Sequence, residues 1–378
     1  MRFNILQIPY MTKASEFPEG IRDGELRGAN SERFQTMLNA MTEQVQFAEE
    51  LGYHGVAWTE QHFQAEGVEV NTNPILYGAH MIANTTRMKV GQLGIPLPCH
   101  NPLLVAENLA ILDHMSGGRT FAGFSRSNTP RYASVLGQHL GIGAASSDKS
   151  ESDERNRRAL QESFQIIKKA WTEDQFCYSG EFWQVPPADV PWEFPPTIDA
   201  GRGTKDGVLS QISVVPKPLQ SPHPPIYSPF AFSMTTARFW AAEGASLVSF
   251  VDKEDFLRTT LDVYRDEATK AEQTIPTGGG LAIGGHLLVQ KSRERSNAYA
   301  TEFERLFNYA YDVPPYNVPL GRKLQGTGDD ALRTIEHLNK ALGIEEIFLW
   351  HHVNCFDDGR EMEALEEFGN KVVARLGD

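Results

Sequence analysis

The chain has 378 residues, of which 40% are hydrophobic and 22% are charged, a composition that predicts a globular protein with one large core or two modest ones. Its formal net charge of −14 argues against nucleic acid and anionic membrane surfaces as partners, since both are polyanions that bind clustered Lys and Arg. The apolar run at residues 3–8 is too short for a signal peptide, and no apolar run is long enough to span a bilayer. We therefore expect a soluble, cytoplasmic protein.

The cysteines are few and far apart. Cys99, Cys177 and Cys355 form neither a disulfide framework nor the spacing of a cysteine-type zinc site. We interpret them as buried or incidental thiols.

The first half of the chain alternates short apolar runs with helical patterns. Strands are expected at 3–8, 55–58, 89–95 and 120–125, and helices at 34–51, 74–83 and 103–115. Asn73 and Pro74 are typical of a helix start, because the Asn side chain caps free N–H groups and proline has no N–H to offer. Four such units with short connections predict parallel strands with right-handed crossovers.

The second half resumes this alternation between two irregular segments. Residues 127–156 are loop-rich and polar, and we interpret the run 146–154 as mobile or solvated. Residues 173–225 are rich in proline and aromatic side chains, and a loop of this length is usually functional or carries extra hairpins. A long helix with Leu160 and Trp171 on one face separates the two segments.

Four further strands complete the pattern, at 226–228, 246–250, 281–289 and 346–350. Helices are expected to begin near Met234, Lys253, Ser292, Asp329 and Asp357. Eight strands with intervening helices predict an α/β fold, a single (β/α)8 TIM barrel domain over residues 1–378 with insertion loops near 127–156 and 173–225.

A cluster of polar side chains follows the second expected strand. The apolar run ends at Ala57 and Trp58 and is followed by Glu60, Gln61 and His62. Ligands of parallel α/β proteins lie at the carboxyl ends of the strands, so this stretch is the first candidate site. Surface positions for Glu60 and His62 are the simpler alternative.

Other site chemistries fit the sequence poorly. The histidines lack the i, i+4 His-Glu spacing of a zinc helix, so we expect no metal. The Gly-rich run 278–285 lacks the Lys and Ser/Thr of a phosphate loop, and we interpret it as close backbone packing. No Gly-x-Ser-x-Gly elbow is present to support a serine hydrolase.

The strand ends favour an anionic cofactor instead. Arg126 directly follows the fourth strand, whose last residue is Ser125, and Ser233 and Thr236 lie at the start of the helix after the fifth. A helix start rich in hydroxyls binds phosphate through its free N–H groups, and an arginine adds charge. The alternative is a plain serine cap and a surface arginine.

Several motifs resemble the core signature of the bacterial luciferase-like flavin monooxygenases, over almost the whole chain. They are 91–98, Asn101-Pro102, Glu107, 112–119, Gly123, 216–226 and 326–328. The resemblance implies a (β/α)8 barrel that binds flavin mononucleotide (FMN) at the carboxyl ends of the strands. Typical members receive reduced FMN from a separate flavin reductase, form a C4a-peroxyflavin with O2 and oxygenate an aldehyde, ketone, alkane or sulfur compound.

The resemblance also implies roles for single residues. Arg126 and Arg158 match phosphate arginines, and Ser233 and Thr236 match the hydroxyl residues of the phosphate-binding helix. Leu93-Gly94 falls where the family often has a non-prolyl cis peptide beneath the isoalloxazine, and we place both residues, with Ser125, among the cofactor-binding candidates.

The opening motif departs from the family pattern. Members with oxygenase chemistry often have Glu-His-His-Phe, whereas this chain has Glu60-Gln61-His62-Phe63. Glutamine can orient a substrate by hydrogen bonds but cannot carry a proton at neutral pH. His62 would then act as the acid/base with Glu60 to orient it, or its ring would pack behind the flavin. The non-catalytic subunit of luciferase has a similar Glu-Asn-His-Phe arrangement.

Together these features predict a two-component, reduced-FMN-dependent monooxygenase acting on a small apolar organic substrate, with Glu60, Gln61 and His62 as catalytic residues. We expect a homodimer, the usual assembly of the family. Candidates for the substrate wall are Tyr10, Trp58, Phe63 and His80, and segment 173–225 is a candidate cover.

Two alternatives stay open. One is a non-catalytic flavin-binding or partner subunit of a heterodimer, favoured by Gln61. The other is deazaflavin-dependent hydride transfer, for which the basic candidates are Arg126, Arg131 and Arg158.

Overall fold

The computed structural model describes residues 1–18, 20–314 and 316–378. They fall into two compact units. The barrel unit comprises Met1–Gly94, Phe121–Phe124 and Pro225–Asp378, and the second unit comprises Ile95–Thr120 and Ser125–Pro224.

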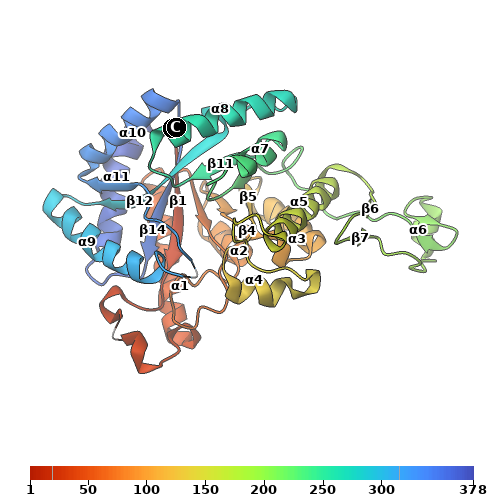
Figure 1. The fold of residues 1–378 in the computed structure, drawn as a ribbon, viewed down its shortest axis with the longest axis horizontal. Coiled ribbons are helices and arrows are strands. Elements are labelled where there is room, and N and C mark those ends of the chain that lie inside the picture. Colours follow the sequence, from red (N-terminus) through yellow and green to blue (C-terminus); the bar gives the residue numbers. More distant parts are fainter. Residues whose placement is uncertain (19, 315) are drawn as a thin grey trace. The chain divides into compact units, whose positions relative to one another are not determined.

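Eight parallel strands close into a barrel, shown in Figure 1, in the order β1-β2-β3-β5-β10-β11-β12-β14 and back to β1. Their bounds are β1 Arg2–Pro9, β2 Gly55–Trp58, β3 Lys89–Gln92, β5 Thr120–Ser125, β10 Ile226–Ser228, β11 Ser246–Ser249, β12 Leu281–Val289 and β14 Glu346–Val353. A further strand, β13 (Lys323–Gly326), pairs parallel with the carboxyl half of β12. The predicted (β/α)8 barrel and its eight strands are confirmed.

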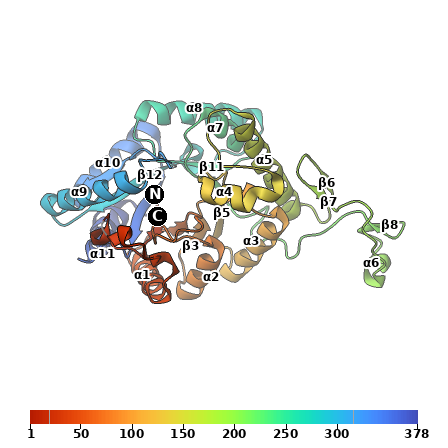
Figure 2. The same ribbon diagram turned by 60° about the horizontal axis from the view of Figure 1, so that its bottom comes forward.

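The helices of the barrel unit lie around the strands, as Figure 2 shows for α1, α8, α10 and α11. Their bounds are α1 Ser31–Glu50, α2 Pro74–Asn84, α7 Met234–Ala242, α8 Glu254–Lys270, α9 Arg293–Ala310, α10 Gly328–Leu342, α11 Arg360–Phe368 and α12 Ala374–Leu376. Short 3-10 turns lie at Ala14–Glu16, Gly20–Asp23, Arg27–Ala29 and Thr277–Gly280, and a π turn at Gly369–Val373. In the described part of the chain, no helix combines the length and apolarity needed to cross a bilayer.

Side chains fill the barrel interior. Phe121 of β5, Tyr227 of β10 and Phe348 of β14 meet edge to face, with ring centroids 5.3 to 6.2 Å apart. Gly91 of β3 leaves the room for this packing, since a Cβ there would lie 2.3 Å from the Phe121 ring. A filled interior leaves the ends of the strands for a ligand.

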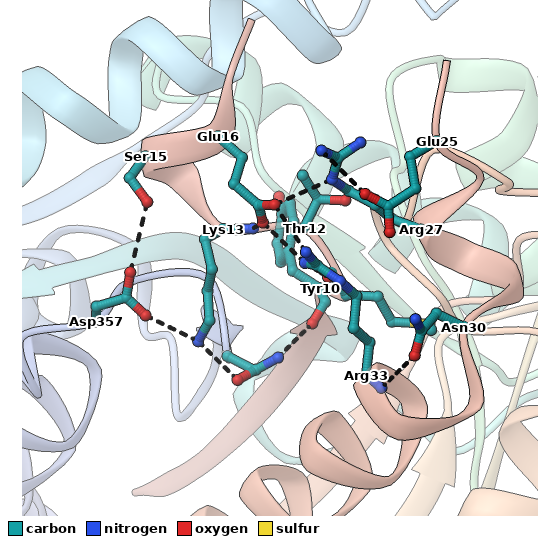
Figure 3. Close-up of polar contacts among 12 residues, drawn as sticks. Tyr10, Thr12, Lys13, Ser15, Glu16, Glu25, Arg27, Asn30, Arg33 and Asp357 are labelled. Carbon is teal, nitrogen blue, oxygen red and sulfur yellow. Dashed lines mark hydrogen bonds and ion pairs between the residues drawn. The ribbon is translucent and has the colours of Figure 1, made fainter. Parts of the chain in front are cut away.

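A charged cluster orders the segment between β1 and α1 (Figure 3). The buried Arg27 donates two hydrogen bonds to Asp23. It also donates one to Glu16, and Arg33 donates to both carboxylate oxygens of Glu16 at 2.9 Å, as Figure 3 shows. Partial burial opposes ionisation of Glu16, but Arg33, the Lys13 N–H and Arg27 outweigh it and lower the pKa of Glu16 to about 2. These ion pairs therefore help to hold the segment in place.

The second unit is built on two long helices. Its elements are β4 Ile95–Pro96, α3 Pro102–Ser116, α4 Pro130–Leu136, α5 Glu151–Thr172, β6 Tyr178–Ser179, β7 Gln184–Val185, α6 Pro195–Asp199, β8 Thr204–Lys205 and β9 Val208–Leu209, with 3-10 turns at Leu97–Cys99 and Gly137–Leu140. The Trp171 indole of α5 donates to the Ala106 carbonyl of α3 at 3.0 Å. The hairpins β6–β7 and β8–β9 project from these helices (Figure 2), so the expected hairpins within 173–225 are confirmed.

The run 146–154 was expected to be mobile or solvated, and residues 146–152 are exposed. Its second half nevertheless forms the ordered start of a helix. Ser150 caps α5 by accepting a hydrogen bond from the Asp153 N–H, and the helix begins at Glu151. Asp153 is fully buried and accepts hydrogen bonds from the Ser147 N–H and from Arg126. The acidic run is the capped first turn of α5, where the positive end of the helix dipole stabilises carboxylates.

Candidate active site

The polar turn after β2 lies at the carboxyl end of the barrel. Glu60 is only 5% exposed, and its Oε1 lies 2.7 Å from Nε2 of the partly buried His62. A carboxylate at this distance holds an imidazole ring in one orientation. The backbone N–H of Gln61 donates to the Asn71 carbonyl at 2.9 Å, which ties the turn to the end of the loop before α2.

The ends of β3 and β5 approach each other through glycines. The Leu93–Gly94 peptide bond is cis. A Cβ on Gly94 would lie 2.9 Å from the Gly123 backbone, and a Cβ on Gly123 would lie 2.1 Å from the Gln92 carbonyl oxygen. Only glycine at these two positions allows the backbones to lie so close.

The start of α7 presents hydroxyl groups next to free helix N–H groups. Ser233 is the N-cap: its Oγ accepts from the Thr236 N–H at 3.2 Å and lies 2.9 Å from the Thr236 Oγ1. Both side chains reach the surface of the barrel unit at the carboxyl end of β10. Because the first N–H groups of a helix lack partners within it, this end can receive an anionic group. The donor set fits a phosphate monoester.

The two predicted phosphate arginines have different partners. Arg126, at the end of β5, donates from Nη1 to Asp153 Oδ1 at 2.9 Å, and Arg157 approaches the other oxygen of Asp153 at 3.5 Å. Arg158 instead donates to Glu151 and Glu181 and is 41% exposed, against 17% for Arg126. Arg126 therefore shares its partner Asp153 with Arg157 rather than with Arg158. Ser125, the last residue of β5, is partly buried.

The sequence model of the luciferase-like monooxygenases matches residues 22–340. The chain belongs to this family.

Two relatives of this luciferase-like monooxygenase illustrate the sequence similarity. An uncharacterized protein of Sinorhizobium fredii is 24% identical over 279 residues, 71% of this chain and 69% of the relative. The oxygenase component of a flavin-dependent trigonelline monooxygenase from Acinetobacter baylyi is 27% identical over 202 residues, 53% of this chain and 45% of that protein.

Solved structures share the fold. The FMN complex of the oxygenating constituent of 3,6-diketocamphane monooxygenase from Pseudomonas putida, a type II Baeyer-Villiger monooxygenase, superposes with a TM-score of 0.71 at 17% identity, covering 100% of this chain and 99% of that chain. The coenzyme F420-dependent tetrahydromethanopterin reductase of Methanopyrus kandleri superposes with a TM-score of 0.63 at 13% identity, covering 99% of each chain.

Two residues predicted to line the substrate pocket of this luciferase-like monooxygenase lie elsewhere. The Trp58 indole donates to Gln7 Oε1 at 3.0 Å and is fully buried against the helix layer. His80 is exposed on α2, and its Nε2 lies 3.0 Å from the Thr42 hydroxyl of α1. Trp58 points away from the barrel interior. Its strand is buried on both faces, so the alternation of apolar and polar residues does not reveal which face points into the barrel. Phe63 is exposed at a φ of 60°, and Tyr10 is buried.

Two residues of the site region were not found from the sequence. Glu69 and Asn71 lie in the loop before α2. Thr59 Oγ1 donates to Glu69 at 2.7 Å and accepts from Asn71 Nδ2 at 2.9 Å. The only sequence signal for these residues was a polar side chain within or beside an apolar segment. Such a signal does not show which residues they hydrogen-bond.

Proposed function

We propose that the protein is the oxygenase component of a two-component monooxygenase. It would bind reduced FMN delivered by a separate flavin reductase and use O2 to oxygenate a small apolar organic substrate. The observation that carries the proposal is the partly buried Glu60–His62 hydrogen bond at the carboxyl end of a barrel strand, in a chain of this family. The named relative from Acinetobacter baylyi, an oxygenase component, supports a reductase partner.

The start of α7 supports FMN as the cofactor. Ser233 and Thr236 would hold the phosphate with the first N–H groups of the helix. Arg126 stays the predicted source of positive charge for the phosphate. Arg158, Ser125, Leu93 and Gly94 stay cofactor-binding predictions. Bound reduced FMN would supply the electrons that activate O2.

The polar turn would handle protons. His62 would accept or donate a proton at its ring, Glu60 would fix the ring and stabilise the charged form, and Gln61 would orient the substrate by hydrogen bonds. Carbonyl, sulfur and alkane substrates all need such a dry, oriented site, since open water would divert the reaction to hydrogen peroxide.

The deciding experiment mixes the purified protein anaerobically with reduced FMN and then with O2 in a stopped-flow spectrometer. We expect a transient absorbance that differs from reduced and oxidised FMN, and product from at least one member of a panel of aldehydes, ketones and thioethers. Free reduced FMN is the control. Hydrogen peroxide alone, with no transient across the panel, would contradict the proposal.

The same preparation separates the alternatives. A partner subunit would bind reduced FMN weakly and recover activity only with a second barrel chain, whereas a deazaflavin enzyme would bind reduced coenzyme F420 in preference to FMN. The F420-dependent reductase named above shares only the fold with this chain. Homodimerisation, a cytoplasmic location and a single domain over 1–378 stay predictions.

A further inference from the structure

A single buried carboxylate in the second unit holds two arginine side chains. Asp153 is fully buried, and its Oδ1 accepts from Arg126 Nη1 at 2.9 Å. The Nη2 of Arg157 lies 3.5 Å from Oδ2 of the same carboxylate. The Ser147 N–H donates to Oδ1 at 3.0 Å, which fixes the carboxylate itself. Asp153 therefore sets the position of two guanidinium groups that would otherwise repel each other.

The backbone that carries Arg126 is held by the same helix. Asn156, fully buried on α5, donates from Nδ2 to the Arg126 carbonyl at 3.1 Å and to the Gly143 carbonyl at 2.8 Å. The next residue, Ser127, has a φ of 62°, in the left-handed region that is unfavourable for serine. Its carbonyl accepts from the Ala145 N–H at 2.8 Å. Strained backbone that several contacts hold in place is concentrated at ligand-binding sites.

Both arginines have N–H groups that the protein does not engage. Arg126 donates only from Nη1, so its Nε and Nη2 have no hydrogen-bond partner among the described residues. Arg157 donates from Nε to Glu154 at 3.2 Å, and its Nη1 has no partner in the same part of the chain. The two arginine side chains are 17% and 16% exposed. Guanidinium groups fixed in this way bind oxyanions such as phosphate through their remaining N–H groups.

The charges of this cluster favour an anion at its surface. Two positive charges share one buried negative charge, that of Asp153. Glu154 also pairs with Arg157, but its side chain is 39% exposed, so water screens its charge. Because the arginine side chains reach the surface and Asp153 does not, an anion that arrives from solvent meets the guanidinium groups rather than the carboxylate.

The geometry of α5 separates Arg157 from its neighbour Arg158. Asp153 and Arg157 are four positions apart, which places them on one face of the helix. Arg158 falls on another face and donates to Glu151 and Glu181 at 2.8 to 3.3 Å. Its guanidinium group is therefore engaged by carboxylates at the exposed surface of the helix.

We propose that Asp153 is a positioning residue, which holds Arg126 and Arg157 together so that the pair binds the phosphate group of FMN. Arg157 then takes the place of the predicted Arg158 as the second arginine for the phosphate. Asp153 acts only through the two guanidinium groups. This inference rests on the proposed function, because FMN is the ligand.

The first test compares FMN with riboflavin, which has the same ring system but no phosphate. Fluorescence titration gives the dissociation constant of each flavin, and their ratio reports the contribution of the phosphate group. Arg157→Met should lower the preference for FMN about 10-fold or more, because hydrogen bonds to a charged group are lost. Arg155→Met is the matched control and should keep the preference, since Arg155 donates to Glu181 and to the Leu140 carbonyl. An equal or larger loss in Arg158→Met would overturn the assignment of Arg157.

The second test asks whether Asp153 positions the arginines. If charge alone matters, removing a negative charge beside the phosphate site strengthens the binding of FMN. Asp153→Asn should instead weaken the binding of FMN about 10-fold and leave the binding of riboflavin unchanged. Glu154→Gln is the control, because it removes a negative charge from the same cluster without releasing Arg126, and its preference for FMN should stay the same or rise.

Every other result for Asp153→Asn counts against the positioning role. An unchanged or raised preference for FMN would mean that the carboxylate acts through its charge alone, and an equal loss of both flavins would mean that it only supports the fold. Asp153→Glu is the second variant, in case the first does not fold. It keeps the charge but displaces the carboxylate by one methylene group, so it should also lower the preference for FMN, and a full preference would overturn the proposal.

Failure of the proposed function gives a different result. A wild type that binds neither flavin would contradict that function, and inorganic phosphate is then the probe. Phosphate should raise the melting temperature of the wild type and of Arg155→Met more than that of Arg157→Met. No stabilisation of the wild type would remove the arginine pair as an oxyanion site. A wild type that binds FMN and riboflavin equally well would overturn this inference alone and leave the flavin proposal standing.

Discussion

At the scale of single residues, the candidate site depends on which side chains the strand ends place together. Glu60 and His62 lie two positions apart and hydrogen-bond at 2.7 Å, so this contact is local. Gln61 between them is held by its backbone N–H. The His62 imidazole stays the predicted acid/base of this turn.

Replacing His62 by Ala should lower the oxygenation kcat about 100-fold or more, because general acid–base catalysis typically contributes 10²- to 10⁴-fold. Steady-state kinetics on a substrate found by the panel would measure this. His80→Ala is the matched control, since His80 lies on the outer face of α2 and should leave kcat unchanged. Equal rates for His62→Ala and wild type would remove the turn from the reaction.

At the scale of elements, the first turn of a helix can contribute both to the stability of the fold and to the binding of a ligand. Ser233 caps α7 and Ser292 caps α9, and in both cases the side-chain oxygen accepts from the N3 N–H at 3.2 Å. Loss of either cap should therefore cost the same stability. A phosphate site would add a second role to only one of them.

Ser233→Ala and Ser292→Ala should each lower the free energy of unfolding by about 1 kcal/mol. Only Ser233→Ala should weaken FMN binding, by about 10- to 150-fold for one lost hydrogen bond to a charged group. Urea unfolding and fluorescence titration with FMN measure the two effects. The phosphate assignment fails if both variants bind FMN equally well.

The segment between β1 and α1 depends on a single carboxylate. Glu16→Gln should lower the free energy of unfolding at pH 7 by about 1.5–3 kcal/mol, because charged hydrogen bonds to two arginines are lost. The folded-state pKa of Glu16 is below its ordinary value of 4.5, so this stabilisation is complete above pH 4.5 and is lost as the pH falls towards about 2. Denaturant unfolding at pH 7 and at pH 3 should show the difference from wild type shrink.

Glu25→Gln is the control for this change. Glu25 is 48% exposed and makes one contact of 3.4 Å with Arg27, so its replacement should have little effect. Comparable losses in both variants would mean that overall charge, rather than the Glu16 ion pairs, holds the segment.

At the scale of the whole molecule, closure of the barrel depends on backbone contact between β3 and β5. Gly123→Ala should cost about 3 kcal/mol or more, because the added Cβ would lie 2.1 Å from the Gln92 carbonyl oxygen and the neighbouring strand has no side chain that can move away. Urea unfolding measures the loss. Gly143→Ala is the control, since its nearest atoms would be 3.6 Å away, in ordinary contact. A stable Gly123→Ala protein would contradict this account of closure.

What the sequence alone determined is local. The eight strands and the main helices follow from runs of apolar residues, from helical spacing and from caps such as Asn73 and Ser292, which act within a few residues. The polar turn after β2 and the hydroxyls at the start of α7 were also visible, because each occupies consecutive positions. The family could be inferred from its motifs.

The tertiary structure decided how these positions meet. It turned Trp58 and His80 away from the strand ends, paired Arg126 with Arg157 through the buried Asp153, and brought the hydroxyls of Tyr10 and Tyr311 together across more than half of the chain. No local pattern records these contacts, since long-range pairing depends on how strands and helices pack rather than on neighbouring residues. The polar turn was evident in the sequence, whereas the hydrogen bonds that Thr59 and Gln61 make with Glu69 and Asn71 were seen only in the folded structure.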